Sequence, residues 1–143
     1  MRARTTGTAL CLLIGTMACG TKPAAPEFPA QPLLSVMSAS GQLHFDVYCQ
    51  VQPVQPGVRV FQFTITSPAG VPQTGLQFSV LPWMPAYGHS APIAPVVQEM
   101  GKGVYQVQEV DLFADGGWQF VVTITAPTTD TATMNFDAEW PSS

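Results

Sequence analysis

The sequence has little charge and almost no histidine. Only 10% of the 143 residues are charged, and the two histidines are His44 and His89. Nucleophilic catalysis needs a Ser, Thr or Cys beside a base that a third group orients, and these histidines form no such set. The sequence also lacks a phosphate-binding glycine loop with its lysine and any paired-cysteine or His-Glu-x-x-His zinc motif. We therefore expect a protein that is not an enzyme.

Cationic side chains are scarce as well. Five Lys and Arg residues stand against nine Asp and Glu residues, which gives a formal net charge of −4. Loss of Arg2 and Arg4 with the N-terminal leader described below leaves a net charge of −6. A negative surface repels the phosphates of nucleic acids and of anionic lipids. We therefore expect no nucleic-acid partner and no docking to a membrane through basic residues.

The three cysteines provide no disulfide for a folded domain. Cys11 and Cys19 lie near the N-terminus, which leaves Cys49 without a partner. Cys49 belongs to an alternating run in which it shares an apolar face with Phe45 and Val47. A cysteine on an apolar face is usually an inert core residue rather than a reactive or metal-binding thiol. The core must then be held together by aromatic packing alone.

The first residues have the pattern of an export signal. Arg2 and Arg4 precede an apolar run that is too short to span a bilayer. We predict a signal peptide over residues 1–18, followed by Cys19 as the residue that carries the lipid of a bacterial lipoprotein. Such signals usually have Leu three residues before the cysteine, and Thr16 stands there instead. Secretion with an unmodified Cys19 therefore stays open as an alternative.

A segment rich in Pro and Ala follows the predicted cleavage site. Residues 19–34 contain little that a core could bury, and this composition is typical of an extended tether. A lipid on Cys19 anchors such a protein in a membrane of the cell envelope, with the domain facing the periplasm or the cell surface. Gly20 replaces the Asp that usually marks retention in the inner membrane, which favours the outer membrane.

Short alternating apolar runs, separated by Pro, Gly and Ser, divide the rest of the chain and predict β-strands. We expect seven of them, over about residues 43–51, 59–66, 76–80, 95–100, 104–112, 118–124 and 134–140. The parity of the apolar residues changes near Gln108 and Glu109, which indicates a β-bulge. In the last strand, Met134 and Trp140 are expected to point inward. Seven antiparallel strands fit an all-β, immunoglobulin-like sandwich over residues 35–143.

One loop carries the side chains of most chemical interest. Met84 and His89 lie five residues apart on a loop rich in Pro and Gly. A thioether beside an imidazole is a donor set that copper selects, so these residues are candidate copper ligands. Met100 or His44 is the candidate for a third donor. In the structural alternative, Met84 is a core residue and His89 fixes the loop through a hydrogen bond.

The same loop supports a second hypothesis of a different class. Trp83 and Tyr87 stand among prolines and would form a rigid aromatic surface of the kind that anchors protein interfaces. The chain would then be a tethered, non-catalytic module that contacts another envelope protein. A copper site requires the sulfur of Met84 and a nitrogen of His89 to converge, whereas an interface requires Trp83 and Tyr87 to be exposed.

The order of the motifs resembles the YtkA-like domain family, which is related to the FixH-like proteins. The resemblance spans about residues 58–125 and rests on Met84-Pro85-x-x-Gly88-His89, Gly103-x-Tyr105 and Leu112-Phe113-x-x-Gly116-Gly117-Trp118. It implies a small exported or membrane-anchored bacterial β-sandwich with a link to copper or cytochrome oxidase biogenesis. Family members often have a methionine just before the Gly-x-Trp segment. This chain has Phe113-Ala114-Asp115 there, so one soft donor that the resemblance implies is missing.

Overall fold

The computed structural model describes residues 27–142, and within them it contains nine β-strands and no helix. The strands are β1 (Leu34–Met37), β2 (His44–Cys49), β3 (Gly57–Thr66), β4 (Gln77–Met84), β5 (His89–Ser90), β6 (Val96–Gly101), β7 (Val104–Leu112), β8 (Gly116–Ala126) and β9 (Asp130–Ala138). The described residues accordingly include no helix that could cross a membrane. The predicted signal peptide over residues 1–18, and Cys19 with the rest of the first half of the predicted tether up to residue 26, lie outside the described residues.

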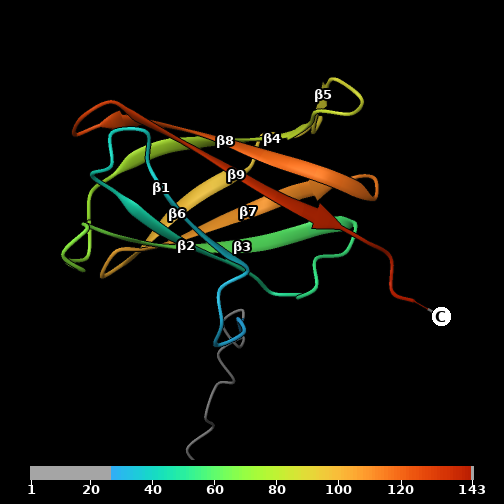
Figure 1. Cartoon of the computed structure of the whole chain (residues 1–143), viewed down its shortest axis with the longest axis horizontal. Helices are drawn as coiled ribbons and strands as arrows, with labels where there is room; N and C mark the ends of the chain where they lie inside the picture. The colour runs from blue at the N-terminus through green and yellow to red at the C-terminus, as the bar shows by residue number, and fades with distance from the viewer. Residues whose placement is uncertain (1–26, 143) are drawn as a thin grey trace, which may run out of the picture.

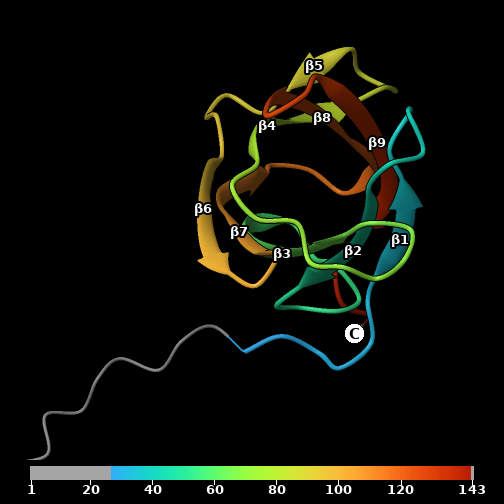
Figure 2. The ribbon, with the colours of Figure 1, turned by 90° about the vertical axis from the view of Figure 1, so that its left-hand side faces the viewer.

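The strands form two antiparallel sheets that pack face to face (Figures 1 and 2). One sheet has the order β1-β2-β3-β7-β6 and the other the order β5-β4-β8-β9. This arrangement confirms the predicted all-β sandwich. The predicted count of seven strands is wrong, because it omits β1 and β5. They have four and two residues, too few to produce a recognisable alternation in the sequence.

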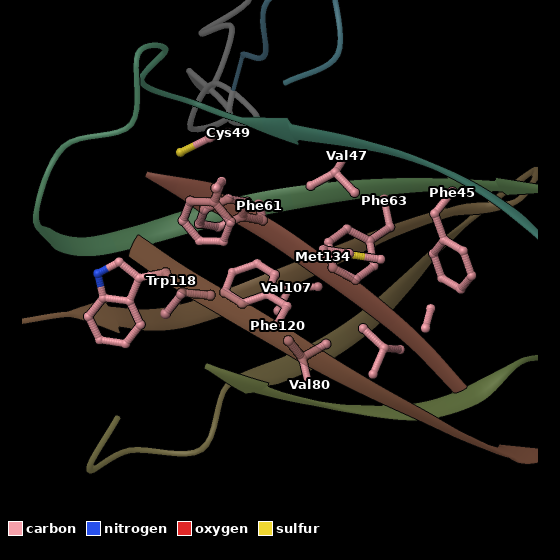
Figure 3. Packing of buried hydrophobic residues seen from close by; sticks show 14 of the residues in the cluster. Phe45, Val47, Cys49, Phe61, Phe63, Val80, Val107, Trp118, Phe120 and Met134 are labelled. Carbon is pink, nitrogen blue, oxygen red and sulfur yellow. The ribbon is translucent and has the colours of Figure 1, made fainter. Parts of the chain in front are cut away.

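Aromatic rings join the two sheets across the core (Figure 3). Phe61 on β3 meets Phe120 on β8 at a centroid distance of 4.8 Å, with the rings inclined by 73°. Phe136 on β9 completes the group, 4.8 Å from Phe120 and 5.4 Å from Phe61. Edge-to-face contacts at such distances add to the free energy gained by burying the rings. The sandwich is therefore held by side chains from both sheets.

Cys49 is a free thiol inside this core, as the sequence predicted. It lies on β2 beside Phe45 and Val47, and all three side chains are fully buried. Burial raises the pKa of the Cys49 thiol, although backbone hydrogen bonds and the charge of Arg59 lower it to a smaller extent. A buried thiol with a raised pKa is a poor nucleophile, so Cys49 is a packing residue.

The predicted bulge lies in β7. The pairing of β7 with β3 shifts at this point, so that Gln108 and Glu109 together face Val60. Glu109 adopts a φ of 59°, which bends the strand and reverses the parity of the residues that follow. The prediction that Trp140 points inward is wrong. Strand β9 ends at Ala138, and Trp140 lies beyond it with 64% of its surface exposed.

The sandwich has two ends that matter for the site. Along β3, Thr66 pairs with His44 at the start of β2, whereas Gly57 pairs with Leu112 at the end of β7. We call the end with Thr66 and His44 the turn end, because it contains the turn between β1 and β2. We call the end with Gly57 and Leu112 the hairpin end, because the β4–β5 hairpin lies there. Figure 1 shows the hairpin at the right and the β1–β2 turn at the left.

Candidate functional site

The Met-Pro-x-x-Gly-His motif forms the β4–β5 hairpin, in which residues 85–88 make the turn. The amide of Gly88 donates a hydrogen bond of 2.9 Å to the carbonyl of Met84. Gly88 has a φ of 63°, a left-handed conformation that glycine adopts without strain. The turn brings the chain back so that Met84 pairs directly with His89. The motif glycine therefore fixes the register of the hairpin.

The two candidate copper donors are consequently close in space. Directly opposite residues of an antiparallel pair have Cβ atoms about 4.5–5.5 Å apart, with their side chains on the same side of the sheet. Met84 is fully buried, and its methyl carbon lies 3.4 Å from the position that a Cβ atom would take on Gly116. His89 is exposed to solvent. The pair combines a thioether in the core with an imidazole open to solution.

The structure does not bring the candidate third donors to this pair. Met100 lies on β6 next to Gly101, which pairs with Val104 at the start of β7. The hairpin lies at the other end of β7, beyond Leu112. Eight residue steps along a strand correspond to about 25 Å. His44 also lies at the turn end, on the opposite side of the molecule from the hairpin. Neither residue can share one metal ion with the hairpin pair in this structure.

The aromatic residues of the motif lie outside the core. Trp83 points to the outer face of its sheet, where it is half-buried next to the exposed Leu81 on the same strand. Tyr87 lies in the turn with 64% of its surface exposed. Ile93, in the segment that leads to β6, is exposed as well. The hairpin end thus presents apolar side chains to solvent from neighbouring segments.

An open pocket of about 330 Å³ lies beside the hairpin. It is lined by Pro85, Ala86, Gly117, Trp118, Asn135, Phe136 and Asp137. Its polar groups come mainly from β9, where the amide of Gln119 on β8 donates to Asn135 at 3.0 Å. Sequence reasoning missed this pocket. No local pattern in the sequence indicates that Asn135 and Asp137 on β9 lie beside the turn that contains Pro85 and Ala86.

Metal ligands with hard or charged donors do not gather at the hairpin. Within residues 27–142, no three or more His, Cys, Asp and Glu side chains lie close enough to hold one ion. A metal ion at the hairpin would therefore depend on the thioether of Met84 and the imidazole of His89, and this donor set fits copper(I) better than zinc or magnesium.

These features define a small β-sandwich domain with a Met-Pro-x-x-Gly-His turn at one end. The chain belongs to the YtkA-like family, whose profile matches residues 37–123, more than half of the chain. The matched region runs from the last residue of β1 into β8 and includes the whole hairpin. No curated protein and no solved structure matches the chain. The YtkA-like family is not a known family of enzymes.

Proposed function

We propose that the chain is an exported, lipid-anchored bacterial domain that binds copper(I) at the β4–β5 hairpin and assists the supply of copper to a respiratory oxidase. The direct pairing of Met84 with His89 carries this proposal. Thioether sulfur and imidazole nitrogen are donors that copper(I) prefers, and these two side chains leave the backbone within about 5.5 Å of each other.

The surroundings of the pair also favour a soft cation. Burial keeps the thioether of Met84 away from bulk water, while the exposed His89 gives an ion a route from solution. Asp137 lines the neighbouring pocket and adds a negative charge to this end of the domain. A carboxylate near the site attracts a cation without acting as its ligand. The hairpin therefore has a donor pair, a route of entry and a favourable charge.

The proposed anchor is the lipid on Cys19, which lies outside the described residues. Residues 27–33 lead into β1 without forming a helix or a strand of their own. A lipidated Cys19 would hold the domain at a membrane of the cell envelope, facing the periplasm or the cell surface. The proposed location of the anchor is the outer membrane.

The copper proposal is tested by titrating the full chain with copper(I) in competition with bicinchoninate. In a Met84→Leu, His89→Ala double variant, the leucine keeps the apolar volume of Met84 but removes its sulfur. We expect this variant to fold and to lose one bound copper(I). Met134→Leu is the matched control, because Met134 is equally buried but pairs with Phe120 rather than with a histidine. Unchanged binding in the folded double variant would contradict the proposal.

The exposure of Tyr87 favours a second candidate function, a non-catalytic module that binds another envelope protein. Trp83 and Tyr87 would anchor such an interface. A photo-crosslinking residue at position 87 should capture one partner in the intact envelope, whereas the same residue at exposed Thr128, at the turn end, should not. Identical adducts from both positions would contradict a specific interface at the hairpin.

A further inference from the structure

A second methionine–histidine pair lies at the turn end of the sandwich. Met37 on β1 pairs directly with His44 on β2. His44 alternates with the buried Phe45, so both side chains of the pair project from the outer face of the five-stranded sheet. Met37 is 45% exposed, and the side chain of His44 is 35% exposed. Both donors are therefore accessible without any change in the core.

The two side chains line the same hollow, which has a volume of about 280 Å³. The other lining residues are Thr66, Ser67, Pro68 and Gly70. None of these carries a charge. Ser67 and Gly70 belong to a tight turn at the edge of the hollow, in which the amide of Gly70 donates a 2.8 Å hydrogen bond to the carbonyl of Ser67. The hollow gives one small ion access to a sulfur and a nitrogen from adjacent strands.

A carboxylate lies behind the imidazole. The Nε2 atom of His44 is 3.9 Å from Oδ1 of Asp46, and the hydroxyl of Ser35 donates a hydrogen bond to the same carboxylate. Histidines that bind metals commonly direct their second nitrogen at a carboxylate, which fixes the orientation of the ring. With Nε2 facing Asp46, Nδ1 is the nitrogen that remains for a metal.

The pairing is shared by both histidines of the chain. His44 stands opposite Met37, and His89 stands opposite Met84. By contrast, Met134 stands opposite Phe120. Each imidazole thus has a thioether within reach across an antiparallel ladder.

We propose that Met37 and His44 form a copper(I)-binding site in which Asp46 is a positioning residue. The thioether and the imidazole are the ligands, and the carboxylate orients the ring and offsets the charge of the ion. The site shares no residue with the β4–β5 hairpin and lies at the opposite end of the sandwich. Its existence therefore does not depend on the copper site proposed at the hairpin.

The test uses the full chain and two double variants, Met37→Leu, His44→Gln and Met84→Leu, His89→Ala. Each is titrated with copper(I) in competition with bicinchoninate. We expect the first variant to bind one copper(I) fewer than the wild type and to keep its melting temperature, since both side chains are partly exposed. Asp46→Asn should keep the stoichiometry but weaken binding at this site by about tenfold, because the carboxylate acts through the ring.

Silver(I), a diamagnetic substitute for copper(I), gives an independent measurement by NMR. The chain has two histidines, so His44→Gln assigns both ring signals. Silver(I) should shift the His44 ring signals in the wild type but not in Met37→Leu. Full copper stoichiometry in Met37→Leu, His44→Gln, or a His44 ring that silver(I) leaves unchanged, would overturn this proposal. Loss of copper only in the hairpin variant would support the hairpin site and reject this one, and the reverse result would do the opposite.

Discussion

Truncation of Trp118 tests the packing at the hairpin end. The indole is 1% exposed, its Nε1 donates a 2.9 Å hydrogen bond to the carbonyl of Ala114, and its ring meets Phe113 edge-on at 5.0 Å. Replacing a buried Trp by Ala usually costs about 3–5 kcal/mol, of which one hydrogen bond accounts for about 1 kcal/mol. Lost packing therefore makes up most of the cost. Because Trp118 also lines the open pocket, water can enter the space left by the ring, and we expect a cost near the lower end of that range, about 3–4 kcal/mol.

Urea unfolding and thermal melts of Trp118→Ala would measure this loss. For a domain of this size, about 4 °C of melting temperature corresponds to 1 kcal/mol, so the melting point should fall by about 12–16 °C. Trp118→Phe should lose less, because a ring stays in place while the hydrogen bond is removed. Trp83→Ala is the control, because Trp83 lies half-buried on the outer face. Its truncation should lower the free energy of unfolding by about 1 kcal/mol or less. A free energy of unfolding for Trp118→Ala within about 1 kcal/mol of the wild-type value would refute the reasoning.

Three further predictions concern the anchor, the core thiol and an acidic residue. Cys19→Ser should move the protein from the membrane fraction to the soluble envelope fraction, and identical fractionation of variant and wild type would reject the lipid anchor. In the Cys19→Ser protein, Cys49 should resist Ellman's reagent until the domain unfolds, because the thiol is fully buried and its pKa is raised. Burial raises the pKa of Asp130, but hydrogen bonds from Ser40 and its neighbours outweigh this effect and lower the pKa to about 2 from 3.8. A carboxyl group whose pKa is lower in the folded state stabilises the fold at a pH above the pKa of the unfolded state. This stabilisation should therefore be lost as the pH falls from 3.8 towards 2, and Asp130→Asn should flatten the pH dependence of urea unfolding in that range.

The longer strands could be predicted because their packing leaves a local pattern. In β8, the buried residues Trp118, Phe120, Val122 and Ile124 occur at every second position. A half-buried strand requires this period, so the sequence alone indicates both the strand and its inward face. The bulge at Gln108 and Glu109 was predictable for the same reason. One extra residue moves every later side chain to the other face, and the reversed parity is visible in the sequence.

The short strands could not be predicted, because pairing rather than periodicity creates them. Strand β1 spans Leu34–Met37, although the composition around Leu34 predicts a tether. This strand exists because its backbone pairs with β2, and its side chains alternate over too few residues to be distinguished from a loop. The sequence therefore points to His44 as a donor but not to Met37. The chemistry of a cross-strand pair becomes visible only when the register is known.

The length and geometry of two turns determine which side chains face each other. Met84 and His89 are five residues apart and become opposite because four residues form the turn, with Gly88 in the left-handed region. Met37 and His44 are seven residues apart and become opposite across a six-residue connection, closed by a hydrogen bond of 2.8 Å from the Ser38 amide to the carbonyl of Leu43. Shifting either register by one residue would move one donor of the pair to the other face of its sheet. The two sites differ in the burial of the thioether, because the sulfur at the hairpin is part of the core while the sulfur at the turn end is open to solvent. Turn geometry therefore decides whether each histidine has a soft partner, and the position of the strand in the sandwich decides how accessible that partner is.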